Sequence, residues 1–331
     1  MRLIACLLLL TFTTGRLNAE PCQGQDLVAA MAPAVRAELQ RETARDPYGE
    51  GLLWQADKPG HRLYLFGTFH LYDPRFAAMQ ETVLSLLAKV DRVYVESQQD
   101  EAADLQTKIT TTPGVMFPED QPTLPEMLSE QEWAHLSGAL RARGMPPALA
   151  SKIAPWLVNL TIALPTCVQA SVVKGRKGLD GQITAEAAAR ALPIQSLDDI
   201  DLVLAILTGD ALGTQINGLR VTIAGLPQAE NAFVTMQAQY PREAHREIWE
   251  FSRHLSKQAG VIAPEEVDAL LDEVESQMMA ARNRHWLETL LAAPAKGTAL
   301  VAVGALHLGG ASGLLALLDQ AGYQLTRLPL H

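Results

Sequence analysis

Two histidines occur in the same local setting near opposite ends of the chain. His70 follows the letters "LYLFGTF" and His307 follows "ALVAVGAL", so each stands three residues after a glycine that closes an apolar run. A glycine there permits a tight turn, and the histidine can then swing back over the end of the strand. A neutral imidazole is a common metal ligand. The repeated Gly-x-x-His step therefore favours two metal ligands, with capping of the strand ends through backbone hydrogen bonds as the alternative.

A carboxylate occupies a similar position on a third apolar segment. The stretch "DRVYVES" alternates Val93 and Val95 and then presents Glu96. Ligand sites in open α/β sheets lie just beyond the carboxyl ends of the strands. Two imidazoles and one carboxylate there form a reasonable ligand set for a divalent metal ion, with room for water. Glu96 fits either a third ligand or a base that takes a proton from activated water, and the sequence does not separate the two roles.

Three residues on a late helical segment offer further chemistry. Arg282 and Asn283 are adjacent, and Trp286 follows one turn later. The asparagine could orient a histidine or bind a peptide carbonyl, and the arginine could balance Glu96 or stabilise a developing oxyanion. The alternative is a helix anchored to the sheet by a buried pair of arginine and carboxylate.

Two polar residues lie beside these motifs. Thr68, next to His70, could donate a hydrogen bond to a ligand or to a substrate carbonyl, or serve as a structural turn hydroxyl. Asp180 precedes the helix expected over Gln182–Ala191 and is placed to cap it.

Short strands near both ends of the chain must position these side chains. The chain has 331 residues of which 48% are apolar, enough to bury a large core. Between about residues 101 and 291 the apolar spacing is almost entirely helical. We therefore expect a mixed α+β protein of the α/β class, one domain over residues 20–331, whose sheet joins distant segments. The predicted strands are Leu52–Ala56, Arg62–Phe66, Asp91–Ser97, Pro193–Leu197, Thr298–Gly304 and Tyr323–Leu328.

The first 19 residues are typical of a cleaved secretory signal peptide. Arg2 precedes a short apolar run, and the small residue Ala19 closes the segment. Export makes a disulfide between Cys22 and Cys167 the simplest pairing of the two cysteines that remain, and two buried free thiols are the alternative. The formal net charge of −10 argues against nucleic acid or anionic lipid as a partner. No other stretch is long and apolar enough to span a membrane.

The chain resembles the TraB/GumN family, whose relatives include the Tiki metalloproteases. The resemblance is carried in family order by "YLFGTFHLYDP", the strand that ends in Glu96, "IAPWLVNL", "KGLDGQITAEAAARALPIQSLDD", "ARNRHW" and "LVAVGALHLGGASGLLALLDQAGY". These segments run from about Leu52 to Leu328. One departure is Leu197-Asp198, where family members often have Leu-Glu, so the shorter carboxylate is at risk of missing its partner. The membrane tether of the Tiki branch is also missing.

The resemblance carries specific expectations. It implies a Tiki/erythromycin-esterase-like fold, a periplasmic or secreted location, and metal-dependent peptide hydrolysis supported by manganese or cobalt, with zinc as an alternative. The family pattern maps onto His70, His307, Glu96 and the Arg282-Asn283 pair, and it adds Asp180 to the site. Fold alone does not settle activity, since relatives of this fold also include haem-binding lipoproteins.

Several familiar catalytic motifs are absent from the sequence. It contains no His-Glu-x-x-His, no Gly-x-Ser-x-Gly, no phosphate loop and no Cys-x-x-Cys. His245 and His254 are nine residues apart in a polar helical segment, which does not place them on one helix face. We therefore expect an exported metal-dependent hydrolase that acts on a peptide or small molecule. The competing hypothesis is a periplasmic binding protein that captures a peptide, metal or haem in the same pocket without turnover.

Overall fold

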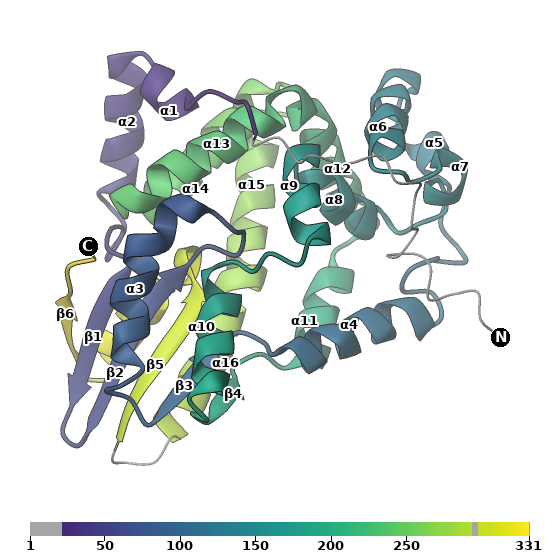
Figure 1. The fold of residues 1–331 in the computed structure, drawn as a ribbon. Coiled ribbons are helices and arrows are strands. Elements are labelled where there is room, and N and C mark those ends of the chain that lie inside the picture. Colours follow the sequence, from purple (N-terminus) through teal and green to yellow (C-terminus); the bar gives the residue numbers. More distant parts are fainter. Residues whose placement is uncertain (1–21, 293–296, 331) are drawn as a thin grey trace.

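A computed structural model of the chain describes residues 22–292 and 297–330, so the expected signal peptide over residues 1–19 lies outside the described residues. Its centre is a six-stranded sheet with the strand order β4-β3-β5-β2-β1-β6 (Figure 1). The strands are β1 (Leu53–Lys58), β2 (His61–Thr68), β3 (Arg92–Val95), β4 (Ile194–Ser196), β5 (Gly297–Gly304) and β6 (Gln324–Arg327).

The sheet joins segments that are far apart in the sequence. Strand β5 pairs in parallel with both β2 and β3, and β4 pairs in parallel with β3. Strand β1 forms an antiparallel hairpin with β2, and β6 lies antiparallel to β1 at the edge. In this register Thr68 lies opposite Gly304 and Val95 opposite Ala302. The carboxyl ends of the four parallel strands therefore lie side by side, and the residues that follow them share one end of the sheet.

Helices bury both faces of this sheet. On one face, α3 (Ala77–Leu86) and α10 (Leu179–Ala189) pack their apolar residues against Val93, Leu300 and Ala302. On the other face, α16 (Arg282–Ala292) and α17 (Leu314–Gln320) pack against Val301 and Val303. Burial on both sides explains why the central strands read as continuous apolar runs without alternation.

The remaining helices form a larger body beside the sheet. Helices α5 to α8 and α12 enclose a second apolar core that contains Leu140, Val158 and Leu219, and α5 to α8 lie well away from the sheet (Figure 1). These remaining helices are α1 (Leu27–Ala30), α2 (Pro33–Thr43), α4 (Gln99–Thr111), α5 (Leu124–Met127), α6 (Glu130–Ala142), α7 (Pro147–Ala150), α8 (Pro155–Ala163), α9 (Thr166–Val173), α11 (Ile200–Gly209), α12 (Leu212–Gly225), α13 (Ala229–Gln239), α14 (His245–Gln258) and α15 (Pro264–Val274). A π-helical segment, η4 (Glu275–Ala281), runs directly into α16.

The predicted mixed α/β fold class is confirmed, and so is the joining of strands from both ends of the chain in one sheet. The helical insert is interrupted by β4, as the short strand predicted over Pro193–Leu197 required. The predicted strand Asp91–Ser97 is shorter in the structure, because pairing with β4 and β5 covers only Arg92–Val95.

The predicted disulfide is also confirmed. A bond joins Cys22 to Cys167 and ties the start of the described chain to α9. Within residues 22–292 and 297–330, no single helix is long and apolar enough to cross a membrane; one bent pair, Ile200–Gly209 with Leu212–Arg242, meets the length and composition criteria only together and turns by 84°.

Candidate functional site

The ends of three adjacent parallel strands bring two histidines around one carboxylate. His70 follows β2, Glu96 follows β3, and His307 ends the short helical turn η5 (Ala305–His307) after β5. Nε2 of His70 lies 3.7 Å from Oε1 of Glu96, and Nε2 of His307 lies 4.0 Å from the same oxygen. The three residues that the sequence selected from distant segments therefore lie together.

Glu96 is held by donors on both of its oxygens. The Gly304 backbone N–H donates to Oε1 at 2.5 Å, and the Arg282 guanidinium donates to Oε2 at 2.7 Å. Burial alone would raise the pKa of Glu96, but the two histidines, Arg282 and the Gly304 N–H together lower that pKa to about 2. The carboxylate is therefore ionised at neutral pH.

Asn283 fixes the orientation of His307. Its side-chain nitrogen donates to the backbone oxygens of His307 and Ser312, at 3.2 and 2.9 Å. Its side-chain oxygen must then face Nδ1 of His307, at 2.8 Å, so Nδ1 carries the proton and Nε2 presents its lone pair. Burial, helped by Arg282, lowers the pKa of His307 to about 3, which keeps the ring neutral.

Arg282 joins this cluster to a second carboxylate. Its Nε and Nη2 donate to the two oxygens of Asp198 at 2.9 and 2.7 Å, and Nη1 lies 3.2 Å from Nε2 of His307. Asp198 also accepts from the indole N–H of Trp286 at 2.9 Å. The indole ring lies 4.3 Å from the His307 ring, centre to centre. The shorter side chain of Asp198 therefore reaches the arginine, and Arg282 anchors α16 to the sheet while contacting the candidate ligands.

Asp198 lies close to the site because it, too, follows the end of a parallel strand. It follows β4 by two residues, just as Glu96 follows β3 by one. All four parallel strands thus place an ionisable side chain at the same edge of the sheet. Burial raises the pKa of Asp198 despite its contact with Arg282. Asp198 was not among the site residues predicted from the sequence.

His70 is the outermost member of the cluster. Its side chain is 55% exposed, and its Nδ1 lies 3.6 Å from Oδ1 of Asp180. The part of the ring that faces the protein is shielded from water, which would lower the pKa of His70, but the carboxylates of Asp180 and Glu96 outweigh that effect and raise the pKa to about 9. His70 therefore prefers the charged form, whereas His307 prefers the neutral one.

The start of α10 packs directly on the backbone of His70. The Leu179 N–H donates to the backbone oxygen of Phe69 at 3.0 Å. A Cβ on Gly178 would lie 2.2 Å from the carbonyl carbon of His70, so only glycine fits there. The expectation that Asp180 caps a helix starting at Gln182 was wrong: the helix begins at Leu179, and Asp180 lies in its first turn beside His70.

Two of the buried oxygens at this end of the sheet that lack hydrogen-bond partners among the described residues lie next to His70. One is Oγ1 of Thr68, which lies opposite Gly304 in the sheet, and the other is Oδ1 of Asp180, whose 3.6 Å separation from Nδ1 of His70 is an ion-pair distance beyond hydrogen-bond reach. Buried polar atoms are normally paired, so both invite a further polar partner. This observation suits the expected role of Thr68 and Asp180 in binding a ligand.

The ligand set suits a divalent cation in type but not in present arrangement. His307, as a neutral imidazole, and Glu96, as an ionised carboxylate, have the protonation states that metal ligands need, whereas His70, whose pKa is raised to about 9, would have to lose its proton first. Within residues 22–292 and 297–330, however, no group of three or more His, Cys, Asp or Glu side chains is arranged to hold an ion. A cation would also have to share Glu96 and His307 with the Arg282 guanidinium.

Comparison with known proteins places these residues inside a family match. The TraB/PrgY/gumN family model matches residues 52–327, a span that contains every site residue described above. Two curated relatives, both named as uncharacterized protein YbaP, come from Escherichia coli K12 and Shigella flexneri. Each is 25% identical over 266 residues, which cover 78% of this chain and 89% of the relative.

Proposed function

The chain belongs to the TraB/PrgY/gumN family, and from that premise we propose that it is an exported, metal-dependent hydrolase that cleaves peptides. The proposed cofactor is a divalent ion, manganese or cobalt, with zinc as the alternative. Export rests on the apolar segment over residues 1–19, and the disulfide between Cys22 and Cys167 supports it, because such bonds persist in oxidising compartments. The proposed location is the periplasm or the extracellular medium.

The single observation that carries the proposal is the convergence of His70, Glu96 and His307 at adjacent strand ends. Their types are those of a hydrolytic metal site with three protein ligands. His307 already has its lone pair directed by Asn283, as is usual for a histidine ligand supported by a neighbouring group.

A bound divalent ion would supply a water of lowered pKa and a polarised scissile carbonyl. The protein's own groups would do the rest. Glu96 is an ionised carboxylate, and its role would be either that of the third ligand or that of the group that takes a proton from the water. Arg282 carries a fixed positive charge, held in place by Asp198, that can balance negative charge developing on the substrate. Thr68 and Asp180 offer buried oxygens for contacts with the substrate.

A second candidate function is capture without turnover, in which the same pocket binds a peptide, metal or haem. The contact of Arg282 with both Glu96 and His307 favours it, because the carboxylate charge is already balanced by the protein. The two functions differ in their need for a base.

The first test is metal binding by the mature protein. Calorimetric titrations with manganese, cobalt and zinc would compare the wild type with His70→Ala and His307→Ala, and circular dichroism would check folding. His135→Ala is the matched control, because that histidine is exposed on α6. We expect one ion to bind the wild type and the control, and both site variants to lose it. Absence of binding by the folded wild type would overturn the metal-dependent reading.

Glu96→Gln then separates catalysis from capture. The amide keeps the size of the side chain and one oxygen acceptor but removes the charge and the base. In a peptide-library cleavage assay, we expect this variant to lose turnover while it still binds peptide. Unchanged turnover in Glu96→Gln would remove Glu96 from the mechanism.

A further inference from the structure

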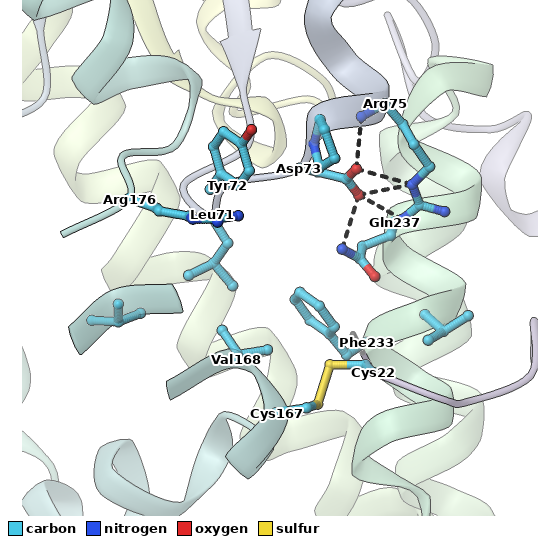
Figure 2. A pocket seen from close by; sticks show the side chains of 13 residues that line it. Cys22, Leu71, Tyr72, Asp73, Arg75, Cys167, Val168, Arg176, Phe233 and Gln237 are labelled. Carbon is cyan, nitrogen blue, oxygen red and sulfur yellow. Dashed lines mark hydrogen bonds and ion pairs between the residues drawn. A yellow bond between two sulfur atoms is a disulfide. The ribbon is translucent and has the colours of Figure 1, made fainter. Parts of the chain in front are cut away.

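A cavity of about 500 Å³ opens beside the loop that follows His70 (Figure 2). Leu71 and Tyr72, the next two residues of that loop, line one side of it. The disulfide between Cys22 and Cys167 lines another side, as Figure 2 shows. The volume is in the range of sites that hold a small ligand or a large side chain. One wall of the cavity is therefore formed by the residues that directly follow His70 of the candidate site.

Part of the cavity wall is apolar and accessible. Leu71, Val168 and Phe233 surround one space from three separate elements (Figure 2). Val172, also in the wall, is 51% exposed. These residues suit an apolar side chain of a ligand.

One residue that lines the cavity, Arg176, belongs to a short basic segment whose charges are not paired with carboxylates of the described residues. Lys174, Arg176 and Lys177 are exposed, and among the described residues none of them forms an ion pair with a carboxylate. Arg176 lines the cavity and lies over the Tyr72 ring, 5.0 Å from its centre. Arg75, by contrast, is paired with Asp73, to which its Nε and Nη2 donate three hydrogen bonds.

This unpaired charge is notable because the chain as a whole is acidic, with a formal net charge of −10. It is also connected to the site. Arg176 stands two residues before Gly178, which packs on the His70 carbonyl. An anionic group bound at Arg176 would therefore lie on the same loop that positions Asp180 beside His70.

We propose that this cavity binds the C-terminal residue of a peptide. Its apolar side chain occupies the space between Leu71, Val168 and Phe233, and its free carboxylate binds Arg176. This inference rests on the proposed hydrolase function and names its substrate class: peptides with a free C-terminus and an apolar last residue. In the reaction, water adds oxygen to the carbonyl carbon and the C–N bond breaks. The two protons of the water end on the new acid and the released amine.

Charge and shape can be tested separately with matched peptides. The probes are fluorescently labelled tetrapeptides of alanine that end in leucine as the free acid, in leucine as the amide, or in glycine as the free acid. Fluorescence anisotropy would measure their binding to the purified protein, with and without chelator. We expect the leucine acid to bind about tenfold more tightly than either of the others. Equal affinity for acid and amide would overturn the proposal.

Two exposed positions supply the variants. Arg176→Gln should lower the affinity for the leucine acid to that of the amide, whereas Lys152→Gln, an exposed basic residue that does not line the cavity, should change nothing. Val172→Glu should weaken the acid more than the amide, because the new carboxylate repels it. An Arg176→Gln variant that keeps the preference for the acid would contradict the assignment.

The outcomes also separate this inference from the function on which it rests. Loss of the acid preference alongside intact metal binding that depends on His70 and His307 would reject the C-terminal pocket alone. A preference for the acid in a protein that binds no metal would reject the hydrolase and leave the cavity as a peptide-capture site.

Discussion

The side-chain oxygen of Asn283 lies 2.8 Å from Nδ1 of His307. Because the amide nitrogen of Asn283 donates to two backbone oxygens, the amide cannot turn over without losing both bonds. The imidazole is thereby held in the tautomer that leaves Nε2 free of a proton. This contact therefore determines that Nε2 of His307 is available as an acceptor or as a ligand.

Replacing Asn283 should change the pKa of His307 in a protein that still folds. In Asn283→Asp, a carboxylate would face Nδ1 and should raise the pKa of His307 from about 3 towards its ordinary value. Nuclear magnetic resonance of the labelled imidazole across a pH series would measure this shift. If the variant is folded and His307 titrates as in the wild type, Asn283 does not control the ring.

Because His245 is buried in its neutral form, we expect the protein to be less stable at acid pH. His245 is 1% exposed, and burial together with Arg246 lowers its pKa to about 4 from 6.5. The unfolded chain therefore takes up a proton first as pH falls. The free energy of unfolding should be constant with respect to this group above pH 6.5, fall by about 3 kcal/mol between pH 6.5 and 4, and then level off.

Denaturant titrations at pH 7 and pH 4.5 would test this contribution. His245→Gln should lose less stability between the two pH values than the wild type loses, because the titrating group is gone. The exposed His135→Gln should follow the wild type, and the remaining slope belongs to other groups such as His307. Equal slopes in wild type and His245→Gln would refute the contribution.

Gly178 should not tolerate even a methyl group. Its added Cβ would lie 2.2 Å from the carbonyl of His70, so Gly178→Ala must push α10 or the His70 loop aside, at a cost of about 1–3 kcal/mol. At Gly138, within α6, nothing lies within 4 Å of an added Cβ, and alanine there should stabilise by about 0.5–1 kcal/mol. Thermal unfolding of both variants would show opposite signs if the packing argument is right.

The disulfide should contribute strongly because it closes a long loop. Cys22 and Cys167 are separated by 145 positions. The double variant Cys22→Ser/Cys167→Ser should lose about 4–5 kcal/mol of unfolding free energy relative to the oxidised protein. Calorimetry of the variant, the oxidised protein and the reduced protein would test it; a variant as stable as the oxidised wild type would contradict the expectation.

The sequence predicted the parts of the site that depend on strand ends. His70, Glu96 and His307 each follow an apolar run, and parallel pairing then brings them to one edge. It could not predict contacts that depend on helix placement. The pairing of Arg282 with Asp198 spans 84 positions and exists only because α16 packs across the end of β4. For the same reason His245, in a polar segment, is buried under Gly309, whose added Cβ would lie 2.5 Å from its Nε2.

The role of Asp180 was also mispredicted, in this case because a local sequence signal was misleading. Its place before an alanine-rich segment is typical of a helix cap, and local preference alone supports that role. The helix instead begins at Leu179, because the Leu179 N–H donates to the backbone oxygen of Phe69, just after β2, and this contact places Asp180 beside His70. A tertiary contact therefore overrides the local signal.

The strand that is synthesised late occupies the middle of the sheet. Strands β2 and β3 do not pair with each other; both pair with β5, which begins at residue 297. A growing or C-terminally shortened chain therefore has two unconnected sheet fragments, with His70 on one and Glu96 on the other. Pairing between strands so far apart in sequence is slow, because the entropy cost of closing the loop comes before any stabilising contact has formed. The cluster of His70, Glu96 and His307 therefore assembles only after β5 has been synthesised.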